Sequence, residues 1–363
     1  MLHRFTLLLS VILLSSPSEA EESRPSSKKD SIVYQEALRY GGWPANQGIW
    51  AWGDEVVVGF TAGWYKAVAS GHAIDSSKPY EKWQARSLDG GATWSVEKPP
   101  QFANAGVMPN QTKLSQPLDF TAPAFALMFQ TYNYNTGPSW FHVSTDRGRT
   151  WSAPFEFAVE GIEKIAARTD YLVLGPQDCL MFGSAAKSNG KEGRAFCART
   201  IDGGITWKLV SKIGVEPGGY AIMPSSLRLK SGAILTTIRR TEPKQDAFIE
   251  ARLSDDLGAH WQNIGVPAPK IGSGNPPSLI ALPDGRLCLC YGYRAKPYGI
   301  RARLSSDKGR TWGDEIILRD DALTSDLGYC RSIARTDGQI LTVYYYNGPK
   351  PEDRTIQATR WKP

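Results

Sequence analysis

The octet SLDGGATW occupies residues 87–94, and related octets return four more times along the chain. Each octet combines a hydroxyl residue, an aspartate, a glycine and an aromatic residue in the same order. The other four are STDRGRTW (144–151), TIDGGITW (200–207), SDDLGAHW (254–261) and SSDKGRTW (305–312). Their aspartates (Asp89, Asp146, Asp202, Asp256 and Asp307) are separated by 57, 56, 54 and 51 residues. A period of this length indicates one small antiparallel sheet per repeat.

The residue types in the octet are those of a tight turn between two strands. An aspartate in a turn can accept hydrogen bonds from the backbone N–H groups one and two residues further on, and glycine supplies a positive φ. The tryptophan provides an apolar lid. Each octet is therefore predicted to close a hairpin. In the fourth octet His260 replaces threonine, so this turn is predicted to be looser or differently bonded.

Between the octets the chain alternates short β-rich runs with turn signals, and no long helical period occurs. The predicted fold class is all-β, a six-bladed β-propeller of four-stranded antiparallel blades, with seven blades as the main alternative. Residues 326–361 provide three strands of the last blade. The segment 31–38 is predicted to add the fourth strand, because closing the ring removes an exposed sheet edge.

The N-terminus has the pattern of an export signal. His3 and Arg4 precede the apolar run 5–14, and SSPSEA ends at Ala20. We expect a signal peptide at 1–20, a disordered leader at 21–30 and a single propeller domain at 31–363, in a secreted or periplasmic protein. The apolar run is too short to span a membrane.

The composition argues against several classes of partner and cofactor. The 42 lysines and arginines are scattered among 36 acidic residues, which argues against nucleic acid and allows a mild preference for anionic ligands. Five cysteines leave at least one free thiol. Cys179 and Cys197 flank a predicted hairpin across which they can pair, whereas Cys288 and Cys290 share one strand face and are predicted to pack in the core. No spacing indicates zinc, and no cofactor is implied.

The octets resemble the Asp-box, or bacterial neuraminidase repeat, SxDxGxTW, and the chain resembles the sialidase superfamily of six-bladed propellers. The resemblance implies that the boxes lie on the rim opposite the active site. The stretch 326–347 is similar to the sialidase segment that carries the nucleophilic tyrosine, and the resemblance places Tyr329 in that role. A neutral phenol suits a sugar with a carboxylate beside its anomeric carbon, because it avoids charge repulsion. The phenol needs a nearby base.

The resemblance also implies an acid/base group and a carboxylate clamp. The loop 71–91 is similar to the sialidase loop that carries the acid/base aspartate, which implies Asp75 in this role, with His72 close enough to share it. Sialidases hold the substrate carboxylate with three arginines. Arg239 matches the second of these, and Arg294 matches the third, with Arg301 as the alternative.

Two departures from the sialidase pattern stand out. Gly42-Trp43-Pro44 occupies the place of the Arg-Ile-Pro triplet, so the first clamp arginine is absent there. The stretch 218–232 contains no glutamate to activate the nucleophile. Arg39 or Arg331 are candidates to replace the arginine, and Asp326 is the candidate to replace the glutamate.

Together these observations predict a secreted, monomeric, sialidase-like glycoside hydrolase that acts on a terminal, acidic sugar of a glycan. A related glycosidase or a lyase is the first alternative, and in that case Trp43, Asn46, Trp64 and Tyr298 shape the pocket. A carbohydrate-binding propeller without turnover is the second. Whether a general acid and a nucleophile converge in the central pocket distinguishes an enzyme from a binding protein.

Overall fold

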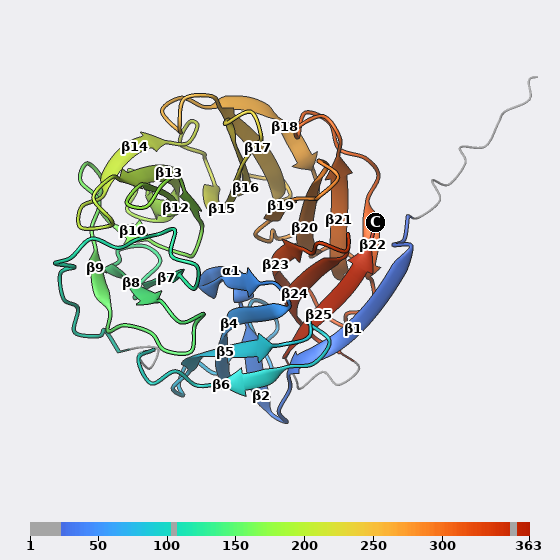
Figure 1. The fold of residues 1–363 in the computed structure, drawn as a ribbon. Coiled ribbons are helices and arrows are strands. Elements are labelled where there is room, and N and C mark those ends of the chain that lie inside the picture. Colours follow the sequence, from blue (N-terminus) through green and yellow to red (C-terminus); the bar gives the residue numbers. More distant parts are fainter. Residues whose placement is uncertain (1–22, 103–106, 349–353) are drawn as a thin grey trace, which may run out of the picture.

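The computed structural model describes residues 23–102, 107–348 and 354–363, and within them it is a ring of six antiparallel sheets (Figure 1). This confirms the predicted all-β, six-bladed propeller. The N-terminal signal expected at 1–20 lies outside the described residues. The one helix in these residues is the short α1 (Pro44–Gln47), which interrupts the inner strand of the first blade.

The strands follow the ring in chain order. The first blade contains β2 (Arg39–Gly42), β3 (Ile49–Trp52), β4 (Glu55–Trp64), β5 (Glu81–Ser87) and β6 (Ser95–Glu97). The second contains β7 (Ala126–Thr131), β8 (Ser139–Ser144) and β9 (Phe155–Phe157). The third contains β10 (Ile165–Ala166), β11 (Tyr171–Val173), β12 (Cys179–Ala186), β13 (Glu192–Thr200) and β14 (Lys208–Lys212).

The remaining three blades have four strands each. The fourth blade contains β15 (Tyr220–Arg228), β16 (Ile234–Thr241), β17 (Phe248–Ser254) and β18 (Gln262–Ala268). The fifth contains β19 (Ser278–Ala281), β20 (Leu287–Tyr293), β21 (Gly299–Ser305) and β22 (Ile316–Arg319). The sixth contains β23 (Gly328–Ala334), β24 (Ile340–Tyr346), β25 (Thr355–Lys362) and, as its outer strand, β1 (Ser27–Tyr34).

The N-terminal strand closes the ring, as predicted, because β1 pairs antiparallel with β25. The strand begins at Ser27 rather than Ser31. Arg24 forms an ion pair with Asp320 at 2.6 Å, and Ser23 forms an isolated bridge with Ile316. Residues 23–30, expected to belong to a disordered leader, are thus held against the fifth and sixth blades.

The second blade departs from the predicted four strands, because its sheet in the described residues consists of β7, β8 and β9. The segment before β7 contains Pro109, Pro117 and Pro123, which cannot donate to a strand ladder. This segment passes the outer edge of the blade instead, where Thr112 bridges to Phe155. The helix α1 packs against β7 on the inner side.

In each box the aspartate carboxylate accepts hydrogen bonds from residues at both ends of one turn. Asp89 Oδ1 accepts hydrogen bonds from the Ser87 hydroxyl at 2.8 Å and from the N–H groups of Ala92 and Thr93 at 2.9 Å each. Its Oδ2 accepts from the Thr93 hydroxyl at 2.6 Å. The backbone donors therefore lie three and four residues after the aspartate, and the predicted offsets of one and two are wrong.

The fourth box is differently bonded rather than open. His260 Nδ1 lies 2.6 Å from Asp256 Oδ2, where the other boxes have a threonine hydroxyl, and the His260 N–H donates to Asp256 Oδ1 at 2.9 Å. The imidazole thus takes the place of the hydroxyl donor. These contacts with His260 lower the pKa of Asp256 to about 2, so the carboxylate is ionised at neutral pH.

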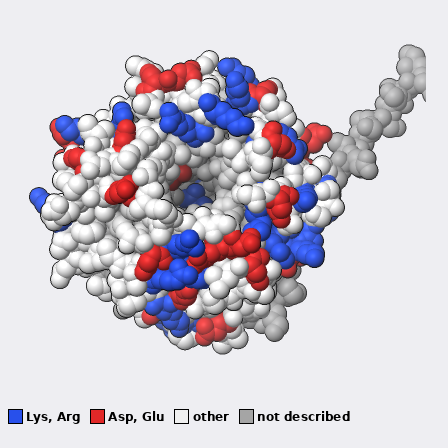
Figure 2. All heavy atoms as spheres, viewed as in Figure 1, with Lys and Arg blue, Asp and Glu red and all other residues white. Residues whose placement is uncertain are grey.

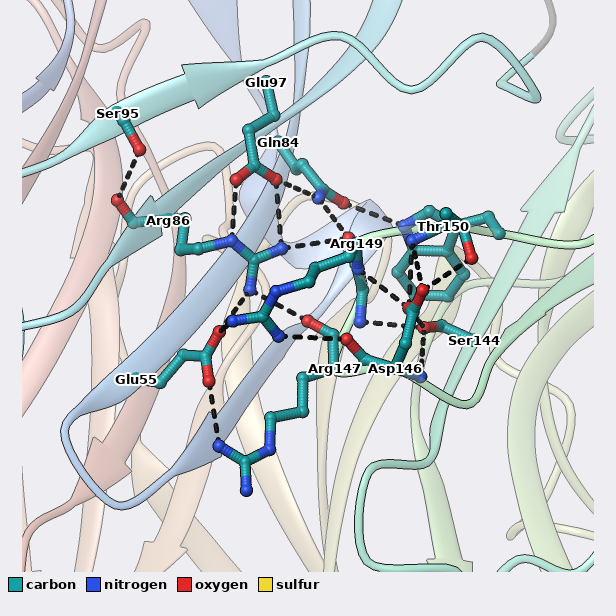
Figure 3. A network of polar contacts seen from close by, with 12 residues as sticks. Glu55, Gln84, Arg86, Ser95, Glu97, Ser144, Asp146, Arg147, Arg149 and Thr150 are labelled. Carbon is teal, nitrogen blue, oxygen red and sulfur yellow. Dashed lines mark hydrogen bonds and ion pairs between the residues drawn. The ribbon is translucent and has the colours of Figure 1, made fainter.

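The second box also binds the preceding blade, as Figure 3 shows. The Gly148 carbonyl accepts hydrogen bonds from Gln84 at 2.6 Å and from Arg86 at 3.0 Å, both on β5. The Trp151 indole N–H donates to Gln84 at 2.9 Å, and Arg86 pairs with Glu55 at 2.8 Å. The box therefore stabilises the contact between two blades as well as its own hairpin.

The boxes and the start of the inner strands lie at opposite ends of the blades. Tyr329 is the second residue of β23. Beyond the other end of this strand, Arg335 pairs with Asp54 at 2.6 Å and lies against Gly90 of the first box. Because each box follows the third strand of its antiparallel blade, the five boxes share the rim that is far from Tyr329.

Replacing Asp202 with Ala should lower the free energy of unfolding by about 1–3 kcal/mol, because the variant leaves donors of the turn unpaired. Asp202 accepts from the hydroxyl of Thr200 at 2.7 Å and from the N–H and hydroxyl of Thr206 at 3.0 and 2.6 Å. Urea unfolding measures the loss, with Asp255→Ala, at an exposed neighbour of Asp256, as the control. Unchanged stability would contradict a structural role for the box.

The described cysteines are free thiols and are buried. In the register of β12 and β13, Cys179 lies opposite Thr200 and Cys197 lies opposite Phe182, so the suggested pair across this hairpin does not form. Cys288 and Cys290 place their sulfur atoms 3.7 Å apart on one face of β20, in the core between the fifth and sixth blades. Core packing was the predicted role for these two residues.

Candidate functional site

A buried carboxylate, Asp326, organises the site at the rim opposite the boxes. Asp326 is only 4% exposed. Its Oδ1 accepts a hydrogen bond from the Tyr345 hydroxyl at 2.8 Å and lies 2.8 Å from His72 Nδ1. Its Oδ2 accepts from the Ala73 N–H and from Arg354 Nε, both at 2.9 Å. Segments from the first and sixth blades thus meet at one carboxylate.

These contacts keep Asp326 ionised. Burial raises the pKa of the Asp326 carboxyl, but the contacts with His72, the Ala73 N–H and Arg354 outweigh burial and bring the pKa to about 2. A carboxylate with four partners and this pKa is a poor base for a phenol. It is instead well suited to orient an imidazole, because a charged acceptor strongly favours a proton on the facing nitrogen.

His72 contacts this network through Nδ1, and no described hydrogen bond uses its second ring nitrogen. Its Nδ1 lies near the Asp326 carboxylate, the Trp43 indole N–H at 3.2 Å and the Tyr345 hydroxyl at 3.2 Å. The carboxylate can only accept and the indole N–H can only donate, so Nδ1 hydrogen-bonds to one of them at a time. We assign the Nδ1 proton to the shorter contact, with the charged Asp326, and Trp43 is then a packing neighbour of the ring. The Nε2 atom then carries a lone pair in the neutral ring and a proton in the charged ring. The side chain is 32% exposed, so this nitrogen can exchange a proton with a ligand.

Tyr329 is held beside His72 in an unusual backbone conformation. Its φ is 51°, in the left-handed region that a bulky residue rarely adopts. The Tyr329 N–H donates to Oδ1 of the buried Asn275 at 2.7 Å, and Asn275 Nδ2 donates to the Leu327 carbonyl at 2.8 Å. The centroid of the Tyr329 ring lies 5.9 Å from that of His72. Strain of this kind, held by a buried side chain, is typical of functional sites.

Arg294 contacts both Tyr345 and Tyr329. It donates to the Leu327 carbonyl from Nε at 3.2 Å and from Nη2 at 3.0 Å, and to the Gly274 carbonyl from Nη1 at 3.0 Å. Nη2 also donates to the Tyr345 hydroxyl at 2.7 Å, and the guanidinium lies 5.6 Å from the centroid of the Tyr329 ring. Most donors of Arg294 are therefore used by the protein, which leaves little of the guanidinium to clamp a substrate carboxylate.

A second cluster adjoins Tyr329 from the third blade. Arg168 donates from Nε to Asn46 Oδ1 at 3.1 Å, lies 4.4 Å from the centroid of the Tyr134 ring and pairs with Glu192 at 2.5 Å. Asn46 Nδ2 donates to the Tyr134 hydroxyl at 3.2 Å. Burial raises the pKa of Tyr134 to about 12, against the opposing effect of Arg168 and with a further contribution from Tyr329. Asn46 belongs to α1, which packs against β23, the strand that carries Tyr329.

Asp75, the other predicted acid/base residue, faces away from this carboxylate network. Its Oδ1 accepts from the Ser77 hydroxyl at 2.7 Å and from the Ser77 N–H at 3.1 Å, and Lys66 lies 3.7 Å away. The Ser77 hydroxyl and N–H lower the pKa of Asp75, so the residue is a carboxylate at neutral pH. These contacts favour His72 over Asp75 as the proton donor. In the same blade, Trp64 is 38% exposed and stacks between Arg39 and Lys78.

Four further predicted residues lie outside the His72–Asp326 network. Arg239 donates to the Ser273 carbonyl at 3.2 Å and stacks on Tyr220. Arg301 is buried and pairs with Glu315 at 3.1 Å. Tyr298 packs at the core between the fifth and sixth blades. Arg331 is buried in the central channel, where it donates to the carbonyl of Ala45 at 2.8 Å and to that of Thr169. None of the described hydrogen bonds or ion pairs joins these four to Tyr329.

The prediction missed the partners that hold the central residues, namely Asn275, Tyr345, Arg354, Arg168 and Tyr134. One signal for Asn275 was present in the repeat period. The Ser332 N–H donates to the Ser278 hydroxyl, and the Leu279 N–H donates to the Ser225 hydroxyl, so neighbouring inner strands are linked by residues 54 positions apart. Asn275 and Tyr329 have the same separation.

The face drawn in Figure 2 is hollowed at the centre of the ring, and basic and acidic side chains intermingle around the hollow. This mixture lacks the continuous basic stripe of a nucleic-acid-binding surface. The described residues contain no group of three or more His, Cys, Asp or Glu side chains placed to hold a metal ion. No helix among them has the length and apolar character needed to cross a membrane.

Several solved structures share this fold. A protein of unknown function from Dyadobacter fermentans DSM 18053 has a TM-score of 0.71 and 21% identity over 94% of this chain and 100% of its own. The Trypanosoma rangeli sialidase in complex with sialic acid has a TM-score of 0.61 and 12% identity, over 93% of this chain and 59% of its own. The Hadza microbial sialidase Hz136 has a TM-score of 0.56 and 14% identity, over 90% and 68%.

The sequence itself gives a family assignment. No curated protein sequence matches this chain. The family model described as a BNR repeat-like domain matches residues 112–342, which is well over half of the chain and includes four of the five boxes. With the six-bladed fold and the Asp-box turns described above, the match shows that the chain belongs to the BNR repeat-like domain family.

Proposed function

We propose that this protein is an exported, sialidase-like enzyme that cleaves the glycosidic bond of a terminal sugar in the pocket beside His72 and Tyr329. The observation that supports it best is the His72–Asp326 pair, because the centroid of the His72 ring lies 5.9 Å from that of the Tyr329 ring. This arrangement supports His72 as the general acid/base beside Tyr329 as the nucleophile. The sialidase neighbours support the fold, and the N-terminal sequence pattern supports export.

In the proposed hydrolysis, charged His72 donates its Nε2 proton to the glycosidic oxygen, and the bond from this oxygen to the anomeric carbon breaks. The Tyr329 oxygen bonds to the anomeric carbon and releases its proton to water in the pocket. Neutral His72 then takes a proton from a second water, whose oxygen displaces the tyrosine oxygen from the sugar. The phenolate is protonated again by solvent.

One observation favours a second candidate reaction, β-elimination from a uronic acid. Among the described residues no hydrogen bond joins a carboxylate to the Tyr329 hydroxyl, and Asp326, the predicted base, contacts His72 and Tyr345 instead. In elimination, neutral His72 removes the proton beside the sugar carboxylate, and the Tyr329 hydroxyl donates its proton to the leaving oxygen. The carbon–oxygen bond breaks and a carbon–carbon double bond forms, so no water is consumed.

Incubation with sialyl, uronyl and rhamnosyl substrates tests the proposal. We expect a new reducing end with at least one substrate and no double bond in the product. Release of an unsaturated sugar that absorbs ultraviolet light would contradict hydrolysis and support elimination. Binding of a glycan to the folded protein without turnover of any substrate would contradict an enzymatic function and leave a carbohydrate-binding propeller.

A further inference from the structure

Lys82 carries a positive charge that no described acidic side chain pairs. It is the second residue of β5, and its amine donates to the Thr61 hydroxyl at 2.9 Å. The ammonium group has three donors, so two remain for other partners. Among residues 23–102, 107–348 and 354–363 no carboxylate lies within ion-pairing distance of this amine. The amine also lies 5.6 Å from the centroid of the Tyr80 ring, so its partners are neutral. A half-buried cation without an anionic partner is costly unless a ligand supplies the opposite charge.

The charge on Lys82 is next to that of Arg168. Lys82 and Arg168 line the same small polar cavity, of about 10 Å³, together with Asn46 and Tyr134. Burial, together with repulsion from Arg168, lowers the pKa of Lys82 to about 8. Glu192 compensates the charge of Arg168. One positive charge thus remains uncompensated in this cavity. A bound anion would offset both the burial of the Lys82 charge and its repulsion from Arg168.

This cavity adjoins the proposed catalytic residues. Asn46 lies on α1, three residues after Trp43, whose indole contacts His72. Asn46 also bonds to Tyr134 and Arg168, and α1 packs against β23, the strand that carries Tyr329. The helix α1 therefore connects the cavity of Lys82 and Arg168 with the proposed catalytic residues. The cavity holds about one water, so a substituent can reach its mouth while the ring stays outside.

We infer that Lys82, supported by Arg168, binds the anionic substituent of the sugar, a carboxylate or a sulfate. The inference rests on the proposed function, because it assigns the specificity of the same pocket. It replaces Arg294 and Arg301 as the carboxylate clamp, since the donors of these two arginines are largely bound to carbonyls and to Glu315. Lys82 keeps two donors and the uncompensated charge for a ligand, and Arg168 lines the same cavity.

The test compares Lys82→Met with the wild-type protein on a uronoside and on its neutral methyl ester. Loss of one charge-assisted hydrogen bond should lower kcat/KM for the uronoside about tenfold or more and change it little for the ester. Lys82→Arg should recover part of the loss. Lys98→Met is the matched control, because Lys98 is an exposed lysine of the same blade that stacks on Trp83 at 4.0 Å. An equal loss on the acid and the ester would overturn the inference.

Calorimetric titration separates this inference from the proposed function. Glucuronate, a sulfated monosaccharide and neutral glucose are titrated into each folded variant. If the wild-type protein binds one of the two anions without turning over any glycoside, and Lys82→Met weakens this binding about tenfold, the inference holds and the enzymatic proposal fails. The anion that binds more tightly shows whether the site prefers a carboxylate or a sulfate. Binding of both anions that is unchanged in Lys82→Met would exclude Lys82 as the anion site. Thermal melting shows that each variant is folded.

Discussion

Replacing His72 with Gln should lower kcat for glycoside cleavage at least about 100-fold, the scale of a general acid or base. Glutamine can still donate a hydrogen bond to Asp326, but it cannot carry a proton to the leaving oxygen or take one from water. The same loss is expected for hydrolysis and for elimination, because both proposed routes use Nε2. Steady-state kinetics on the best substrate from the glycoside screen measures the change.

The chain offers a matched control for this experiment. His260 also contacts a carboxylate, Asp256, at 2.6 Å, but it lies in the fourth box on the opposite rim and its side chain is 90% exposed. His260→Gln should therefore retain full turnover. Wild-type kcat in a folded His72→Gln protein would remove His72 from the chemistry and return Asp75 to consideration as the acid.

The second large effect is expected at Tyr329. Tyr329→Phe removes one oxygen and keeps the ring that packs in the core beside His72 and Tyr345, so the fold should be unchanged. Turnover should fall at least about 100-fold, because either the nucleophile or the acid is lost. Tyr171→Phe is the control. Tyr171 lines the central channel with Trp50 on the box side of α1, and it should leave kcat unchanged.

A covalent adduct distinguishes the two roles of Tyr329. With a fluorinated sugar that slows the second step, hydrolysis should leave a mass increase on the peptide that contains Tyr329. Elimination should leave none. Full activity of Tyr329→Phe would exclude both roles and point to direct attack of a water activated by His72.

The sequence predicted the blade architecture because the information for each blade is local. All the groups that close a box lie within eight residues, as Asp89 shows with Ser87, Ala92 and Thr93. The ring closure by β1 also followed from the sequence, since three strands at the C-terminus required a fourth. The absence of an inner strand from the described part of the second blade could not be predicted from the sequence. The helix α1, which comes from the first blade, packs against β7 on that side, and this contact between blades is not visible in the sequence.

The candidate site was predictable only in part. The residues around Tyr329 and His72 were identified from the stretches in which they lie. The choice between His72 and Asp75 was not, because both belong to one loop. In the structure Asp75 bonds to Ser77, two residues away, whereas His72 meets Asp326 from 254 positions away. The box offsets were wrong for a simpler reason: the turn is wider than the tight turn assumed.

The sequence by itself determined the repeat, the all-β blades and the place of Tyr329 in the last blade, and it favoured six blades over seven; the rim of the boxes was implied by the family resemblance. Tertiary structure alone decided which polar groups remain available for a ligand. Arg294 and Lys82 are both basic residues, but the carbonyls of Leu327 and Gly274 use the donors of Arg294, while the Lys82 amine donates to the Thr61 hydroxyl and lies over the Tyr80 ring without an acidic partner among the described residues. The physical reason is that the neighbours of a polar group in space decide which of its hydrogen-bond donors and acceptors stay unused. These neighbours come from segments that are far apart in the sequence.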